Sequence, residues 1–140
     1  QHNTVRAVAD YQFGPGAGDD LFEDLEIRGS QPGLQAHDGD GEQLAVITRN
    51  YGTLAFTLAG ARHWVESDAP TKRVEIDAFV PHGSVLAPGV VDADEDIRVG
   101  DEVVVEGPSA FAVGRAKMSG PEMVRSTRGI ATQVRHVEET

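Results

Sequence analysis

The first apolar positions along the chain repeat at helical spacing. Within residues 3–13 the apolar side chains lie one, three or four positions apart, at Val5, Val8, Ala9 and Phe13. A segment of glycine and proline at residues 14–16 ends this pattern. Residues 16–24 predict a second, short helical turn, and residues 58–67 predict a further helix.

Between these helices, apolar and polar positions alternate as they do in β-strands. The alternation predicts short strands in residues 25–29, 34–38, 44–50 and 53–60. The segment Asp38-Gly39-Asp40-Gly41 predicts a hairpin turn between the second and third of them. Residues 67–73 are polar with one proline and predict a linker. The first part of the chain, residues 1–70, therefore predicts an α+β domain, a small antiparallel sheet with helices on one side.

The second part, residues 71–140, has a different pattern. Valine- and isoleucine-rich stretches predict strands in residues 73–80, 101–107, 109–118 and 129–139. Residues 119–126 predict one short helix, with Ser119 as its N-cap and Pro121 in its first turn. Closely spaced strands with glycine at the bends predict an all-β domain, a small closed barrel.

Charge changes this picture more than composition does. The 140 residues hold 23 acids and 12 bases, a net charge of −11, and the bases include only two lysines, Lys72 and Lys117. An acid-rich, lysine-poor surface suits a salt-loving cytoplasm, because high ionic strength screens self-repulsion. The alternative, a protein that binds cations or basic partners, needs a focused acidic site, whereas these acids are spread along the chain.

Several site classes find no support in the sequence. Without cysteine there is no disulfide and no thiolate zinc site, and the five histidines lack the spacing of metal ligands. The acids at residues 92–96 predict a solvated turn, since their spacing fits no calcium loop. His82, Ser84 and Asp101 could form a triad on paper, but no nucleophile elbow accompanies them. We therefore predict no catalytic site, metal or cofactor. No apolar run approaches the roughly 18 residues that would indicate a membrane span, and no secretory signal is visible, which predicts a cytoplasmic protein.

One stretch runs against the acidic character of the chain. Residues 107–136 carry five bases and one acid, Glu122, a local charge of +4. The bases are Arg115, Lys117, Arg125, Arg128 and Arg135. Such a stretch in an acidic chain indicates an anionic ligand, while chance clustering on a solvated pair of strands is the simpler alternative. By strand alternation, Arg115 and Lys117 share one face and can touch successive phosphates unless a bulge intervenes.

Three segments of the second part resemble a known family. They are HGSVLAPGVVDADEDIRVGDEVVV (82–105), FAVGRAKMSGPEM (111–123) and RGIATQVRHVEE (128–139). Together they closely resemble the PUA domain, a pseudobarrel RNA-binding module named for pseudouridine synthases and archaeosine transglycosylases, over about residues 72–140. In the first part, VADYQFGPGAGDDLF (8–22) resembles the start of the small α+β domain that precedes PUA in archaeal proteins, including archaeosine tRNA-guanine transglycosylase and its synthase paralogue.

The resemblance implies a non-catalytic protein that binds structured RNA, with tRNA as the leading candidate, in RNA modification or translation. An RNA-modifying enzyme is a further candidate partner. In PUA domains, helical RNA is read mainly through its backbone and shape. The residues that we expect to contact RNA are Phe79, Val80, His82, Gly83, Ser84, Val85, Arg115, Lys117 and Arg128. Gly100 and Asp101 are expected to form a turn, and Gly114 a strand bend or a close approach of two backbones.

Two other functions compete with this one. The chain resembles the C-terminal, tRNA-targeting portion of a tRNA-guanine transglycosylase-like enzyme, whose catalytic barrel of about 250 residues these 140 could not supply. Alternatively, the valine-rich faces of the barrel serve protein assembly, which a large exposed apolar patch would favour.

Overall fold

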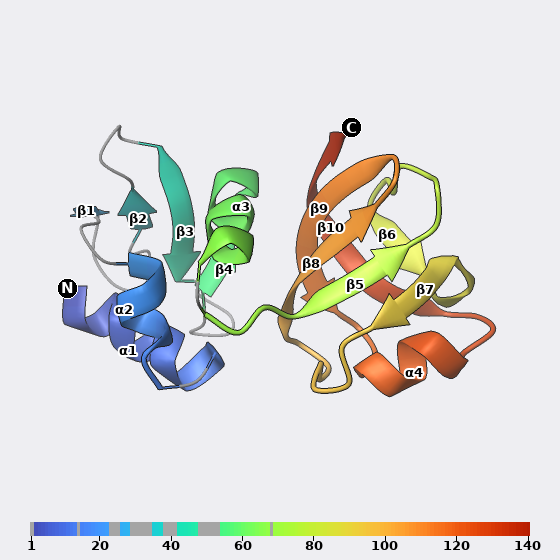
Figure 1. The fold of residues 1–140 in the computed structure, drawn as a ribbon, viewed down its shortest axis with the longest axis horizontal. Coiled ribbons are helices and arrows are strands. Elements are labelled where there is room, and N and C mark those ends of the chain that lie inside the picture. The colour runs from blue at the N-terminus through green and yellow to red at the C-terminus, as the bar shows by residue number, and fades with distance from the viewer. Residues whose placement is uncertain are drawn as a thin grey trace. The chain divides into compact units, whose positions relative to one another are not determined.

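The computed structural model describes residues 2–13, 15–22, 26–28, 35–37, 42–47, 54–67 and 69–140. The predicted hairpin turn at residues 38–41 lies outside these ranges. The described residues form two compact units, residues 1–71 and 72–140, drawn in Figure 1. None of the helices in these ranges combines the length and apolar character needed to cross a membrane.

The first unit has the predicted α+β architecture. Its helices are α1 (His2–Phe13), α2 (Ala17–Phe22) and α3 (Leu58–Glu66), and its strands are β1 (Glu26–Arg28), β2 (Gln35–His37), β3 (Gln43–Ile47) and β4 (Leu54–Phe56). The strands pair antiparallel in chain order, β1-β2-β3-β4. Phe13, Phe56 and Trp64 pack ring against ring in its interior.

The predicted strand at residues 53–60 was too long. Strand β4 ends at Phe56, because the side chain of Thr57 accepts a hydrogen bond from the backbone amide of Gly60 and so caps α3. Gly60 then packs against β3, where a Cβ atom would lie only 1.7 Å from the carbonyl oxygen of Leu44. The glycine is therefore needed for the close approach of this helix to the sheet.

The second unit is a curled six-stranded sheet in the order β6-β10-β9-β8-β5-β7, in which only the β5–β8 pair is parallel. Its elements are β5 (Arg73–Ile76), β6 (Ser84–Leu86), the 3₁₀ turn η1 (Ala87–Gly89), β7 (Val90–Ala93), β8 (Glu102–Gly107), β9 (Ala110–Ala116), α4 (Gly120–Arg125) and β10 (Ile130–Glu139). In Figure 1 the strands curl around a shared interior with α4 at one end. That interior is filled mainly by valine, alanine and isoleucine, with Met123 of α4.

Local features of this unit agree with the sequence, with two corrections. Ser119 caps α4 in a capping box with Glu122, as predicted for the N-cap. The strand predicted at residues 73–80 ends at Ile76, and the turn predicted at residues 92–96 was wrong for Asp92 and Ala93. These two residues belong to β7 and pair with β5, so only the residues after them form the turn.

Candidate nucleic-acid interface

A hollow of about 580 Å³ lies where strands β6 and β10 meet the end of β9. Its lining residues are Gly83, Ser84, Lys117, Ile130 and Gln133. The sheet brings them together, because Gln133 of β10 is the register partner of Ser84 on β6. On the other side of β10, the backbone amide of Lys117 donates to the carbonyl of Ala131 at 2.7 Å. Three separate stretches of sequence therefore converge on one surface.

Gly83 gives this hollow an open wall. Its φ is +84°, a backbone conformation that residues other than glycine rarely adopt. No atom lies within 4 Å of the position that a Cβ would occupy. Its carbonyl accepts a hydrogen bond from the amide of Val134 at 3.0 Å, which ties the loop before β6 to β10. A ligand can therefore approach the backbone closely here.

The polar side chains of the hollow are available for a ligand. Within the described part of the chain, Ser84, Lys117 and Gln133 make no side-chain hydrogen bond or ion pair. They offer a hydroxyl, an ammonium and an amide, which together can meet a phosphate and the polar edges of a nucleotide. Beside them, Ile130 is 47% exposed and its register partner Leu86 is 55% exposed. The hollow thus combines one cation, two uncharged polar groups and an apolar rim.

The structure places the predicted RNA-contact residues in different environments. Gly83, Ser84 and Lys117 line the hollow, and His82 and Arg128 are exposed. Val85 is fully buried in the interior of the unit, and Phe79 packs against that interior; Val80 is half-buried. Direct contact with RNA stays a prediction for all of them, but the side chain of Val85 faces away from solvent.

Arg115 is the register partner of Gln133 but is not among the residues that line the hollow. It is half-buried in β9, and its Nη1 donates to the carbonyl of Gly100 at 2.9 Å. Gly100 has a φ of +92° in the predicted turn, and the carboxylate of Asp101 accepts from the backbone amide of Arg98 at 2.8 Å. Both expectations for this turn are therefore confirmed. The guanidinium of Arg115 belongs to the same network.

Sequence reasoning missed Gln133 and Ile130. Both lie in a strand that was correctly predicted, and neither carries charge, so no residue type marked them. Their place in the hollow depends on β10 pairing with β6 on one side and β9 on the other. The available signal was the polar Gln133 between Thr132 and Val134, both of which are buried in the structure.

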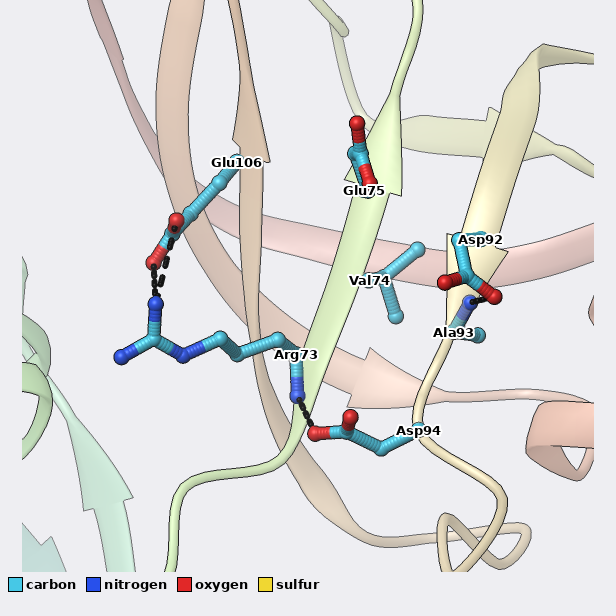
Figure 2. Close-up of a pocket in the computed structure, with 7 residues that line it drawn as sticks. All are labelled: Arg73, Val74, Glu75, Asp92, Ala93, Asp94 and Glu106. Carbon is cyan, nitrogen blue, oxygen red and sulfur yellow. Dashed lines mark hydrogen bonds and ion pairs between the residues drawn. The ribbon is translucent and has the colours of Figure 1, made fainter.

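A second hollow, of about 250 Å³, lies on strands β5, β7 and β8 and has the opposite charge. Its lining residues include four carboxylates and one base: Glu75, Asp92, Asp94, Glu106 and Arg73. Figure 2 shows the Arg73 guanidinium reaching Glu106, at 3.4 Å, while its backbone amide donates to Asp94 at 2.8 Å. The remaining negative charge disfavours a polyanion. Among the described residues, no group of three or more acidic, histidine or cysteine side chains could hold a metal ion.

The chain is similar to two family models that follow one another. Residues 3–70 match the patch-forming domain C2 of tRNA-guanine transglycosylase, and residues 72–137 match the PUA domain. The solved structure of a conserved PUA domain protein from Thermoplasma acidophilum aligns with 96% of this chain and 85% of its own, with a TM-score of 0.67 and 24% identity. This likeness confirms the predicted fold.

Two longer proteins share much of the sequence. An archaeosine synthase of Haloferax volcanii is 66% identical over 141 residues, which cover 99% of this chain and 24% of that protein. A tRNA-guanine(15) transglycosylase of Pyrococcus furiosus is 36% identical over 145 residues, which cover 96% of this chain and 25% of that protein. The chain therefore spans about a quarter of the length of these relatives. Their archaeal sources, Haloferax among them, agree with the archaeal, salt-loving source predicted from charge and resemblance.

Proposed function

Because the chain belongs to the family that joins a tRNA-guanine transglycosylase C2 domain to a PUA domain, we propose that it binds structured RNA, with tRNA as its ligand, and performs no catalysis itself. Family membership supports RNA as the ligand class, and the names of the relatives support tRNA. On this proposal the protein acts in the cytoplasm, beside or within an RNA-modifying enzyme.

The observation that carries this proposal is the hollow between β6, β10 and the end of β9. In a chain with a net charge of −11, its lining holds Lys117 and no carboxylate. The other hollow described above is lined by four carboxylates. A polyanion is attracted to the first surface and repelled by the second. We therefore place the phosphate of the RNA at Lys117, with Ser84 and Gln133 beside the adjoining sugar or base.

The experiment is a salt titration of binding to a fluorescently labelled tRNA transcript, followed by anisotropy. Each lost phosphate contact removes roughly 0.7–0.9 from the slope of log affinity against log salt, so Lys117→Ala should weaken binding and flatten the slope by about that amount. Arg125→Ala is the matched control, because Arg125 is exposed at the end of α4 and loses the same charge. Equal losses from both variants, or no binding by the unaltered protein, would contradict the proposed site.

A second function is favoured by the length of the relatives. Since the chain spans about a quarter of them, we also propose that these residues act as the tRNA-targeting portion of an archaeosine tRNA-guanine transglycosylase-like enzyme. The RNA-binding surface is the same in both cases. The mass of the native protein, detected in cell extract with an antibody against residues 72–140, distinguishes them: a band near 14.9 kDa supports a separate protein, and a much larger band supports the enzyme.

A further inference from the structure

Arg115 was expected to contact RNA, but its guanidinium already has a partner within the chain. Its Nη1 donates to the carbonyl oxygen of Gly100 at 2.9 Å, and the side chain is half-buried beside the turn at residues 98–101. A hydrogen bond from a charged donor is about twice as strong as one between neutral groups. This bond uses one of the five N–H donors of the guanidinium and holds the group beside the turn.

The bond joins the turn to the end of β9. The amide of Gly100 donates to the carbonyl of Ala116 at 2.8 Å, and the amide of Ala116 donates to the carbonyl of Asp101 at 2.8 Å. With the bond from Arg115, three hydrogen bonds therefore hold the last two residues of β9 against this turn. The turn itself is closed by the carboxylate of Asp101, which accepts from the amide of Arg98 and from Lys72 Nζ.

Lys117 directly follows this clamped end of β9, which consists of Arg115 and Ala116. Its backbone amide donates to the carbonyl of Ala131 at 2.7 Å, so its main chain is held between the turn and β10. From this position its side chain lines the hollow with Ser84 and Gln133. Any loosening of the turn would change the path of the chain at Lys117 first.

We propose that Arg115 is a positioning residue, which acts on RNA binding through Lys117 and makes no phosphate contact of its own. The inference rests on the proposed RNA-binding function. It predicts that the positive charge of Arg115 is unimportant for binding and that its donor to Gly100 is important. The two roles give opposite results in a salt titration, because only a direct phosphate contact contributes to the slope.

The test compares Arg115→Ala, Arg115→Gln and Lys117→Ala for binding to labelled tRNA over a range of salt. Arg115→Ala should lower affinity roughly three- to tenfold, the effect of one hydrogen bond, and leave the slope unchanged. Arg115→Gln keeps a donor without the charge and should restore part of the affinity. In the Lys117→Ala background, Arg115→Ala should have little further effect, since coupled residues are not additive. A slope flattened by about 0.7–0.9 in Arg115→Ala, or additive losses, would overturn the proposal.

A second measurement needs no RNA. Amide hydrogen exchange at Gly100, Ala116 and Lys117 should become faster in Arg115→Ala and return toward the original rates in Arg115→Gln, because these amides make the bonds of the clamped end. Unchanged exchange in Arg115→Ala would overturn the proposal whatever the RNA result. If the unaltered protein binds no tRNA while exchange at these amides still rises, the proposed function fails and the clamping of Lys117 stands.

Discussion

Glu102 and Arg135 form a two-pronged ion pair between strands β8 and β10, which are separated in the sheet by β9. Arg135 Nη1 donates to Glu102 Oε1 at 3.1 Å, and Nη2 donates to Oε2. Arg135 is the extra residue of a bulge in β10, because the register with β9 shifts between Val134 and His136. The Glu102 side chain is fully buried, so this arginine of the basic stretch neutralises a carboxylate within the fold.

Removing one partner of this pair should be costly. Arg135→Ala removes the ion-pair partner of the buried Glu102 carboxylate, and we expect a loss of about 3 kcal/mol in the free energy of unfolding, measured with urea at high salt. Replacing both residues by leucine should recover most of this loss, since apolar substitutes need no desolvation of charge. A loss below about 1 kcal/mol in Arg135→Ala would show that other groups compensate Glu102.

The neighbouring His136 should add a pH dependence. Partial burial, and then the positive charge of Arg135, lower the pKa of His136 below its ordinary value of 6.5. The unfolded chain therefore binds more protons than the folded protein in this range, so the contribution of His136 to stability is complete above pH 6.5 and is lost as the pH falls through the lowered pKa. Thermal melts from about pH 7.5 to pH 5 should show a smaller fall in midpoint for His136→Asn. An identical fall in both proteins would assign the pH dependence to other groups.

Local sequence signals predicted the local structure well. The cap at Ser119, the turn at Gly100 and the close approach at Gly114 each depend on a few neighbouring residues. At Gly114, a Cβ would lie 2.0 Å from the carbonyl oxygen of Gln133, so only glycine fits. In contrast, β6 and β7 have three and four residues, too few to show an alternating pattern.

The candidate site could be predicted only in part, because it depends on how distant strands pair. Gly83, Ser84 and Lys117 stood out by residue type or family resemblance, whereas Gln133 lies in the hollow because of its register with Ser84. For Arg115, alternation predicts the strand face but not the hydrogen bond that its guanidinium makes to Gly100. Pairings between distant segments decide both cases.

Thr132 offers a test of packing in the second unit. Its side chain is fully buried and, within the described residues, its hydroxyl has no hydrogen-bond partner. A buried hydroxyl without a partner costs about 1–3 kcal/mol, and valine has nearly the same shape. Thr132→Val should therefore raise the free energy of unfolding by about 1 kcal/mol in urea titrations, with Thr127→Val, at an exposed position, as the control. A destabilised Thr132→Val protein would indicate that the hydroxyl binds an internal water.

The carboxylates of the second hollow should make the fold depend on salt. Glu75 is the register partner of Asp92 on β7 and of Glu106 on β8, so three carboxylates lie in a row across neighbouring strands. Like charges placed opposite one another destabilise a sheet by about 0.2–1 kcal/mol per pair. Among the residues that the structure describes, the side chain of Arg73 forms an ion pair with Glu106 only. The Debye length falls from about 10 Å at 0.1 M salt to about 3 Å at 1 M, so added salt should remove most of this repulsion.

We therefore expect the unaltered protein to melt at a lower temperature in about 0.1 M KCl than in about 3 M KCl, and Glu75→Gln to narrow that difference. Relief of about 1 kcal/mol corresponds to a rise of roughly 4–8 °C at low salt for a domain of this size, and the two proteins should melt together at high salt. Glu139→Gln removes the same charge from β10, where the register partner is the uncharged Ala110. Because it relieves no carboxylate pair, this control should change the low-salt midpoint by much less. Equal rises in both variants would mean that net charge, and not the row of carboxylates, sets the salt dependence.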